Sequence, residues 1–179
     1  MDDNNFIKIS KNCDAVLIPS GDAIKIKKGT PVKITQSLGG YFTLYVNGNL
    51  VKLDGKDAEA IGQKIAAKPE SVYSKEFDEN LIWDQLKTCY DPEIPVNVVD
   101  LGLIYDLEYE NISKEEYYVK IKMTLTAPGC GMGPAIAADV EQKVKGLHFV
   151  KDVLVELVWD PIWNQDMMTE EAKLKLGMM

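Results

Sequence analysis

One cysteine, Cys130, has surroundings that favour thiol chemistry. It lies in the run Thr-Ala-Pro-Gly-Cys-Gly-Met-Gly from Thr126 to Gly133, directly before a stretch with helical spacing of apolar residues, Gly131 to Lys145. The first N–H groups of a helix have no intrahelical acceptor, so they stabilise a thiolate, a sulfide or another anion placed there. Three glycines without Cβ atoms let backbone or a ligand approach closely. We predict Cys130 as a functional thiol whose supporting turn consists of Thr126, Gly129, Gly131 and Gly133.

The helix alone does not ionise this thiol. A charge at a helix end is stabilised by about 1 kcal/mol, which lowers a pKa by about one unit. Only a minority of thiolate then exists at neutral pH, so a metal ion or another cation must complete the activation. The single histidine, His148, follows the far end of the helix, at roughly 20 Å, so a Cys-His hydrolase pair is not expected. The alternative is that Cys130 is a small buried residue in a tight turn.

Carboxylates precede the first strand of the predicted sheet. Asp91 and Glu93 lie in a rigid turn with two prolines, and Asp100 lies at the entry to the strand. They either cap turns by accepting from nearby N–H groups or approach Cys130 as hydrogen-bond acceptors or oxygen ligands. Cys89 either supplies a second sulfur or completes the apolar stripe of a helix. We leave these alternatives open.

Aromatic residues end the last strand. Trp159 and Trp163 in the run Trp-Asp-Pro-Ile-Trp either cover the site, form a docking surface or pack in the core.

The periodicities predict an α+β domain around these residues, at 78–177. Odd-numbered apolar residues dominate three segments, 101–109, 117–125 and 153–159, as in half-buried strands. The short connection between the first two predicts an antiparallel hairpin, and the helix from Gly131 makes the last two parallel. We therefore expect a compact domain with a three-stranded mixed sheet, a strand-helix-strand crossover, and further helices at 78–90 and 169–176.

The N-terminal part, residues 1–70, has a different pattern. Short apolar bursts between Ala15 and Leu53 are separated by turn residues, among them Asn47-Gly48, which is a strong hairpin signal. A helical stretch from Asp54 to Ala66 follows. We predict a small β-rich module that ends in a short helix.

Composition excludes several classes of function. Twenty basic and 28 acidic residues give a net charge of -8, which repels a nucleic-acid backbone. The N-terminus has neither a basic nor an apolar leader segment, and no apolar run is long enough to span a membrane. The three cysteines show no close spacing typical of disulfide frameworks or zinc sites. We expect a cytoplasmic protein with reduced thiols, without nucleic-acid or membrane partners.

Three separated motifs resemble the SufT/PaaD-type iron-sulfur assembly family: Asp91 to Tyr105, Thr126 to Cys130, and Val158 to Pro161. The segments 18–21 and 34–40 are also similar to SufT. Many relatives have proline after the cysteine, where this chain has Gly131. The resemblance implies an auxiliary factor in maturation of iron-sulfur proteins, with Cys130 as the reactive or cluster-handling residue. Implied partners are iron-sulfur assembly proteins and recipient apoproteins.

One cysteine does not hold a stable cluster, which needs about four protein ligands. Transient iron or a transient cluster, completed by a partner or a homodimer, is therefore expected at Cys130. We expect a non-enzymatic role, with two alternatives kept: a scaffold for assembly components without thiol chemistry, and a thiol-dependent enzyme.

Overall fold

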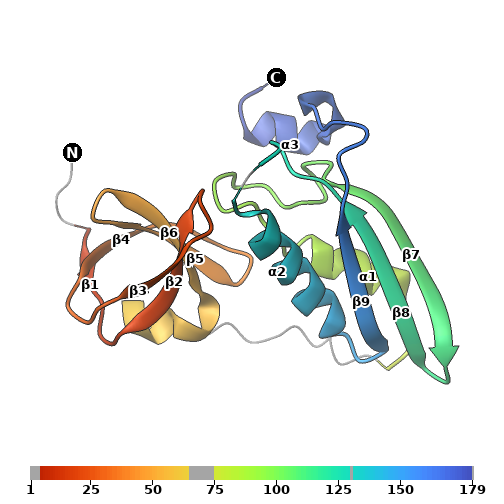
Figure 1. Ribbon diagram of the computed structural model, residues 1–179, viewed down its shortest axis with the longest axis horizontal. Coiled ribbons are helices and arrows are strands. Elements are labelled where there is room, and N and C mark those ends of the chain that lie inside the picture. Colours follow the sequence, from red (N-terminus) through yellow and green to blue (C-terminus); the bar gives the residue numbers. More distant parts are fainter. Residues whose placement is uncertain (1–4, 65–74, 130, 179) are drawn as a thin grey trace. The chain divides into compact units, whose positions relative to one another are not determined.

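The computed structural model describes residues 5–64, 75–129 and 131–178. Contacts divide the chain into two units, Met1–Ala67 and Lys68–Met179, and each is described by itself (Figure 1). Cys130 lies outside the described residues. No helix in the described ranges is long and apolar enough to cross a membrane.

The N-terminal unit is built from six antiparallel strands and a 3-10 helix. The helix, Gly55–Ile61, lies within the predicted helical stretch Asp54–Ala66 but ends earlier, at Gly62, which has a φ of 72°; residues 65 and 66 of that stretch lie outside the described residues. The strand order in the sheet is β1-β4-β5-β6-β2-β3. The strands are β1 (Ile7–Lys8), β2 (Cys13–Ile18), β3 (Ala23–Ile26), β4 (Pro31–Leu38), β5 (Tyr41–Val46) and β6 (Asn49–Asp54).

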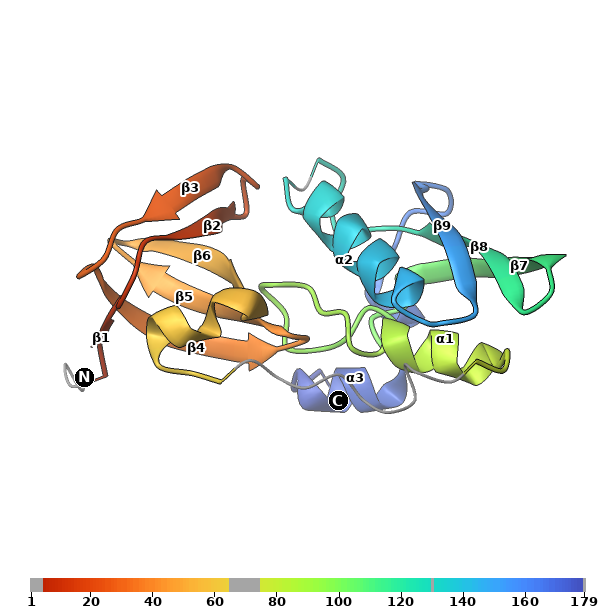
Figure 2. The same ribbon diagram turned by 90° about the horizontal axis from the view of Figure 1, so that it is seen from below.

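This sheet curls so that its two outer strands approach each other (Figure 2). Ile9, after β1, donates to the carbonyl oxygen of Thr30 at 3.0 Å and accepts from the N–H of Gly29 at 2.7 Å. Fully buried side chains such as Val32 and Leu44 fill the interior. The predicted hairpin turn is present, because Asn47 and Gly48 both have positive φ, 49° and 86°.

The C-terminal unit has the predicted α+β architecture. Its sheet has the order β7-β8-β9, in which β7 and β8 are antiparallel and β8 and β9 are parallel. The helix α2 (Gly133–Lys145) connects the parallel pair, which confirms the strand-helix-strand crossover. The remaining elements are β7 (Ile104–Ser113), β8 (Glu116–Met123), β9 (Val150–Leu157), α1 (Glu79–Leu86) and α3 (Glu170–Lys175).

Hydrophobic periodicity explains how sheet and helices pack. Val119, Ile121 and Met123 alternate along β8 and are fully buried, whereas the lysines between them are half-buried. On α2, Ile136, Val140 and Val144 recur every four residues and are also buried, so one stripe of the helix faces the core. The helices α1 and α2 lie on the same side of the sheet (Figure 1).

Two predicted boundaries are wrong in an informative way. The first strand begins at Ile104 and not at Leu101, because the chain turns at Gly102, which has a φ of 75°. Leu101 and Leu103 are nevertheless fully buried, which explains their strand-like alternation. The helix α1 ends at Leu86 and not near Tyr90, because the N–H of Cys89 bonds to the carbonyl oxygen of Leu86 in a turn.

Candidate functional site

The three sequence motifs meet at one edge of the β7-β8-β9 sheet. Because β8 and β9 are parallel, their carboxyl ends lie at the same edge, together with the beginning of the antiparallel β7. The N–H of Thr124 bonds to the carbonyl oxygen of Leu103, and the N–H of Val158 bonds to that of Met123, each at 2.8 Å. Figure 1 shows this edge at the end of the sheet opposite the β7-β8 turn. We call residues 89–103, 124–133 and 158–169 the site edge.

The loop that contains Cys130 joins β8 to α2. On one side of Cys130, Pro128 and Gly129 are exposed, and on the other Gly131 is half-buried. Met132 is the N-cap residue of α2, and its side chain makes no capping hydrogen bond, while proline occupies the first turn. Among the described residues, the helix therefore begins without a side-chain cap.

Two of the glycines near Cys130 are required for different structural reasons. Gly129 has a φ of 77° and open space around its position for a Cβ atom, so it is needed for the turn itself. Gly133 is buried, and a Cβ atom there would lie 2.7 Å from Cδ1 of Leu125. Gly133 therefore lets α2 begin close against the end of β8. The half-buried Thr126 precedes this turn.

Asp91 caps its own turn. Its Oδ1 accepts a hydrogen bond of 2.9 Å from the N–H of Glu93, and its side chain is only 6% exposed. Burial raises the pKa of this carboxyl group, although the backbone hydrogen bonds from Glu93 and Ile94 act in the opposite direction. The side chain of Glu93 is exposed. The described geometry thus favours a turn-capping role for Asp91 over ligand binding.

Asp100 is held by a residue that we did not single out in the sequence, Asn97. The Oδ2 atom of Asp100 accepts from Nδ2 of Asn97 at 2.8 Å. The Oδ1 atom of Asn97 accepts from the N–H groups of Val99 and Asp100 at 3.0 and 2.9 Å. Asparagine is a typical first residue of such a turn, because its side-chain oxygen accepts from backbone N–H groups two and three residues later. Across the described residues, no group of three or more His, Cys, Asp or Glu side chains could hold a metal ion.

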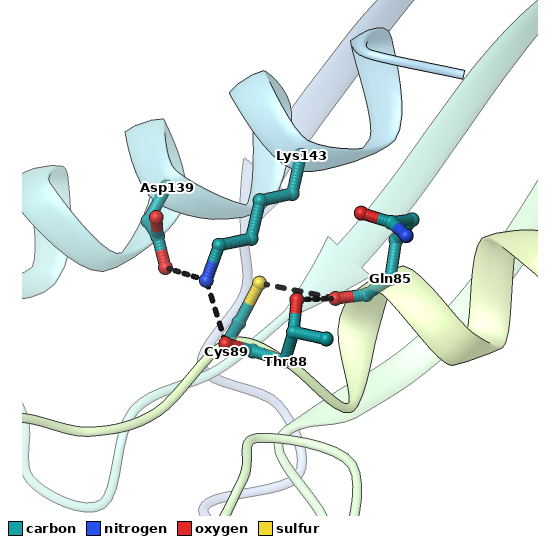
Figure 3. A network of polar contacts seen from close by, with 5 residues as sticks. All are labelled: Gln85, Thr88, Cys89, Asp139 and Lys143. Atoms are coloured by element: carbon teal, nitrogen blue, oxygen red, sulfur yellow. Dashed lines mark hydrogen bonds and ion pairs between the residues drawn. The ribbon is translucent and has the colours of Figure 1, made fainter. Parts of the chain in front are cut away.

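Cys89, the first residue of the site edge, lies in a network of polar contacts with Gln85, Thr88, Asp139 and Lys143 (Figure 3). It is fully buried, and its Sγ atom lies 3.6 Å from the carbonyl oxygen of Gln85, to which it donates a weak hydrogen bond. Next to it, Nζ of Lys143 bonds to the carbonyl oxygen of Thr88 at 2.6 Å and pairs with Asp139 at 3.2 Å. This burial favours the packing interpretation of Cys89.

The segment after β9 is bound across the beginning of β7. The indole N–H of Trp163 bonds to the carbonyl oxygen of Leu101 at 2.7 Å, and the hydroxyl of Tyr105 bonds to that of Pro161 at 2.7 Å. At Gly102, a Cβ atom would overlap the backbone carbonyl group of Met167. Trp163 is thus a half-buried anchor and not an exposed docking residue, whereas Trp159 is 42% exposed.

Thr124 directly follows β8, at the beginning of the loop that contains Cys130. Its buried hydroxyl group was not predicted from the sequence. Its side chain is 1% exposed, and its hydroxyl has no hydrogen-bond partner among the described residues. In the alternation along β8, Thr124 falls on the same face of the sheet as Lys120 and Lys122, which are only half-buried. The periodicity of the sequence therefore does not predict that Thr124 is buried. His148 is exposed and follows the carboxyl end of α2, whose other end adjoins the Cys130 loop.

Comparison with known proteins identifies the family of the C-terminal unit. The family model described as "Iron-sulfur cluster assembly protein" matches residues 79–157. A Porphyromonas gingivalis protein named "Fe-S protein maturation auxiliary factor" is 49% identical over 94 residues, which are 52% of this chain and 86% of that protein. The chain belongs to the iron-sulfur cluster assembly protein family. The SufT-type resemblance of the sequence is thereby confirmed.

Two further proteins support the same family assignment. The Staphylococcus aureus "Fe-S protein maturation auxiliary factor SufT" is 38% identical over 87 residues, 49% of this chain and 94% of that protein. A Bacillus anthracis structure titled as a domain of unknown function, DUF59, is 34% identical with a TM-score of 0.50, and the match covers 56% of this chain and 92% of that one. These relatives account for about half of this chain, so the similarity of residues 18–21 and 34–40 to SufT stays a prediction.

Proposed function

We propose that this protein is an auxiliary factor in the maturation of iron-sulfur proteins and that it engages iron, a cluster or a partner's thiol through Cys130. The observation that carries the proposal is the convergence of three separated motifs at the site edge, around a glycine turn that opens α2 without a side-chain cap. The names of the relatives, which are maturation auxiliary factors, support the same role.

The chemistry of this site is incomplete by itself. An uncapped helix start lowers a thiol pKa by about one unit, which leaves most of the thiol protonated at neutral pH. Cys13 and Cys89 are buried and do not offer accessible sulfur, and burial, followed by the nearby Asp57 and Asp14, raises the pKa of the Cys13 thiol. A ligand at Cys130 is therefore shared with something outside the chain, and binding is transient.

The proposed role is non-catalytic. A thiol enzyme needs a general base close to its sulfur. The carboxylates of Asp91 and Asp100 accept hydrogen bonds within their own turns, and His148 follows the other end of α2. The partners that fit this role are assembly proteins and recipient apoproteins in the cytoplasm, and a second copy of the chain would bring a second Cys130.

The decisive experiment is complementation of a cell that lacks this protein. We expect the Cys130→Ser variant to fail to restore the activity of iron-sulfur enzymes, whereas Cys13→Ala and Cys89→Ala restore it at matched protein abundance. The two control variants remove thiols of the same type from buried positions. Immunoblots and near-ultraviolet circular dichroism of the purified variants verify abundance and folding.

The scaffold alternative makes the opposite prediction. If a folded Cys130→Ser variant restored the enzymes as well as the wild-type chain, the thiol mechanism would be wrong and the site edge would serve only for docking. In that case, loss of function is expected on changing the exposed Trp159. Iron and sulfide counts on protein purified without oxygen show separately whether the chain retains a cluster.

A further inference from the structure

All charged residues in the sequence of the site edge are acidic. Its three segments, 89–103, 124–133 and 158–169, contain no lysine, arginine or histidine in their sequence, although the chain has 20 basic residues. Five acidic residues lie in the same segments: Asp91, Glu93, Asp100, Asp160 and Asp166. Glu93, Asp160 and Asp166 are exposed. The charged side chains that these segments expose are therefore all negative.

Large apolar side chains are exposed on the same edge. Ile162 is 72% exposed and Trp159 is 42% exposed, and they stand on either side of Asp160 and Pro161. Exposed tryptophan next to exposed aliphatic side chains is typical of protein interfaces, where buried aromatic anchors contribute most of the affinity.

The turn that carries these side chains is held from both ends. Val158 bonds to Met123 within the sheet, Tyr105 bonds to the carbonyl oxygen of Pro161, and Trp163 bonds to that of Leu101. The turn is thus anchored before Trp159 and on both sides of Ile162. A surface that is ordered before binding loses less conformational entropy when a partner docks.

We propose that the turn from Trp159 to Ile162 is a docking surface for a protein partner whose contacting segment combines apolar side chains with lysine or arginine side chains. The exposed acidic residues of the site edge select a basic partner, and they repel nucleic acids and anionic membranes, which carry negative charge themselves. The inference rests on the proposed function, since a partner bound here would lie at the same edge of the sheet as the loop of Cys130.

The test uses the full chain and three synthetic peptides of equal length. One contains leucine and lysine, one leucine and glutamate, and one serine and lysine, so that apolar content and charge vary separately. Binding is followed by the indole N–H signals of the three tryptophans in NMR spectra. We expect the leucine-lysine peptide to shift the Trp159 signal and to leave that of Trp83, which donates to Glu79 on α1, in place. The other two peptides are expected to bind at least about tenfold more weakly.

Variants locate the binding surface. Ile162→Ser is expected to weaken binding of the leucine-lysine peptide about tenfold. The matched control is Ile112→Ser, which removes an isoleucine that is 49% exposed close to the β7-β8 turn, far along the strand from the site edge. Three results each overturn the proposal: no binding of the leucine-lysine peptide, equal binding of the leucine-glutamate peptide, or equal weakening by the two substitutions.

Complementation separates this inference from the proposed function. If the wild-type chain restores iron-sulfur enzymes and Cys130→Ser does not, the proposed function is supported. If Ile162→Ser then restores them fully, only the docking surface is rejected and the proposed function remains. If Ile162→Ser fails while Ile112→Ser succeeds, the docking surface is supported. Failure of the wild-type chain itself to restore the enzymes rejects the proposed function, whatever the peptides do.

Discussion

Lys143 on α2 donates a hydrogen bond of 2.6 Å to the carbonyl oxygen of Thr88, two residues beyond the end of α1 (Figure 3). The same ammonium group lies 3.2 Å from the carboxylate of Asp139. One cation thus joins the crossover helix to the segment that leads into the Asp91 turn. Because both side chains of the ion pair are only about one fifth exposed, 20% and 18%, this contact is less screened by water than a surface pair.

We expect Lys143→Met to lower the free energy of unfolding by about 1–3 kcal/mol, because it leaves a carbonyl oxygen and a carboxylate unpaired. The control is Lys145→Met on the same helix, whose ion pair with Asp152 is about half exposed. This substitution is expected to cost less than about 0.5 kcal/mol. Urea unfolding measures both, and equal effects would show that the Thr88 contact contributes nothing.

Gly102 is the crossing point of two chain segments. It has a φ of 75°, and a Cβ atom would overlap backbone atoms of Met167. Gly177 also has positive φ, 70°, but open space around it. Both Gly→Ala substitutions incur the cost of positive φ, about 1–2 kcal/mol, and Gly102→Ala adds an overlap that we expect to cost about 1–3 kcal/mol more. Thermal unfolding of the two variants, compared at the same pH, gives this difference directly.

Asp91→Asn is predicted to change how stability depends on pH. The amide oxygen of asparagine still accepts from the N–H of Glu93, so the turn is kept. Burial raises the pKa of Asp91 in the folded protein above its unfolded value of about 3.9. Between these two values the folded state binds more protons than the unfolded state, so the wild-type protein loses stability as the pH rises through this window.

The difference in unfolding free energy, variant minus wild type, is therefore expected to increase with pH just above about 3.9 and then to level off. Urea unfolding at a series of pH values measures it. Asp84→Asn, at an exposed position of α1, controls for the loss of one negative charge. A difference that stays flat, or that falls with pH, would contradict the burial of the Asp91 carboxyl group.

Thr124→Val is expected to stabilise the protein by about 1 kcal/mol, because it removes a buried hydroxyl that has no partner among the described residues. Thr88→Val is the matched control, since the hydroxyl of Thr88 donates to the carbonyl oxygen of Gln85 at 2.6 Å. Its loss is expected to cost about 1 kcal/mol. Denaturant unfolding measures the change in unfolding free energy of both variants. Changes of opposite sign would support the unpaired hydroxyl of Thr124, and a destabilised Thr124→Val variant would refute it.

The sequence was informative wherever burial repeats along one element. The alternation of Val119, Ile121 and Met123 predicted β8, and the spacing of Ile136 and Val140 predicted α2, because each pattern reflects one continuous buried face. Parallel pairing of β8 and β9 followed from the crossover. That topology alone was enough to bring the Cys130 loop and the Trp159 segment to one edge.

The sequence did not predict where some strands and helices begin or end, or which groups certain side chains bond to, because both depend on contacts between distant segments. Leu101 and Leu103 alternate like strand residues, but the chain turns between them at Gly102, which has positive φ and leaves no room for a Cβ atom next to Met167. The roles of Asp91 and Asp100 stayed open, since a carboxylate has the same sequence signature as a turn cap and as a ligand. For Trp163, the sequence left covering the site, docking and core packing open, and the structure shows its indole N–H bonding to the carbonyl oxygen of Leu101. Such pairings are decided by tertiary packing and not by local preference.

The turn between β7 and β8 has a practical value for cell biology. Lys114 and Glu115 form its exposed tip, and the sheet separates them from the site edge along the full length of two strands. An epitope or a fluorescent label inserted between these two residues would allow the protein to be followed in living cells while the thiol loop and the Trp159 turn keep their own surroundings.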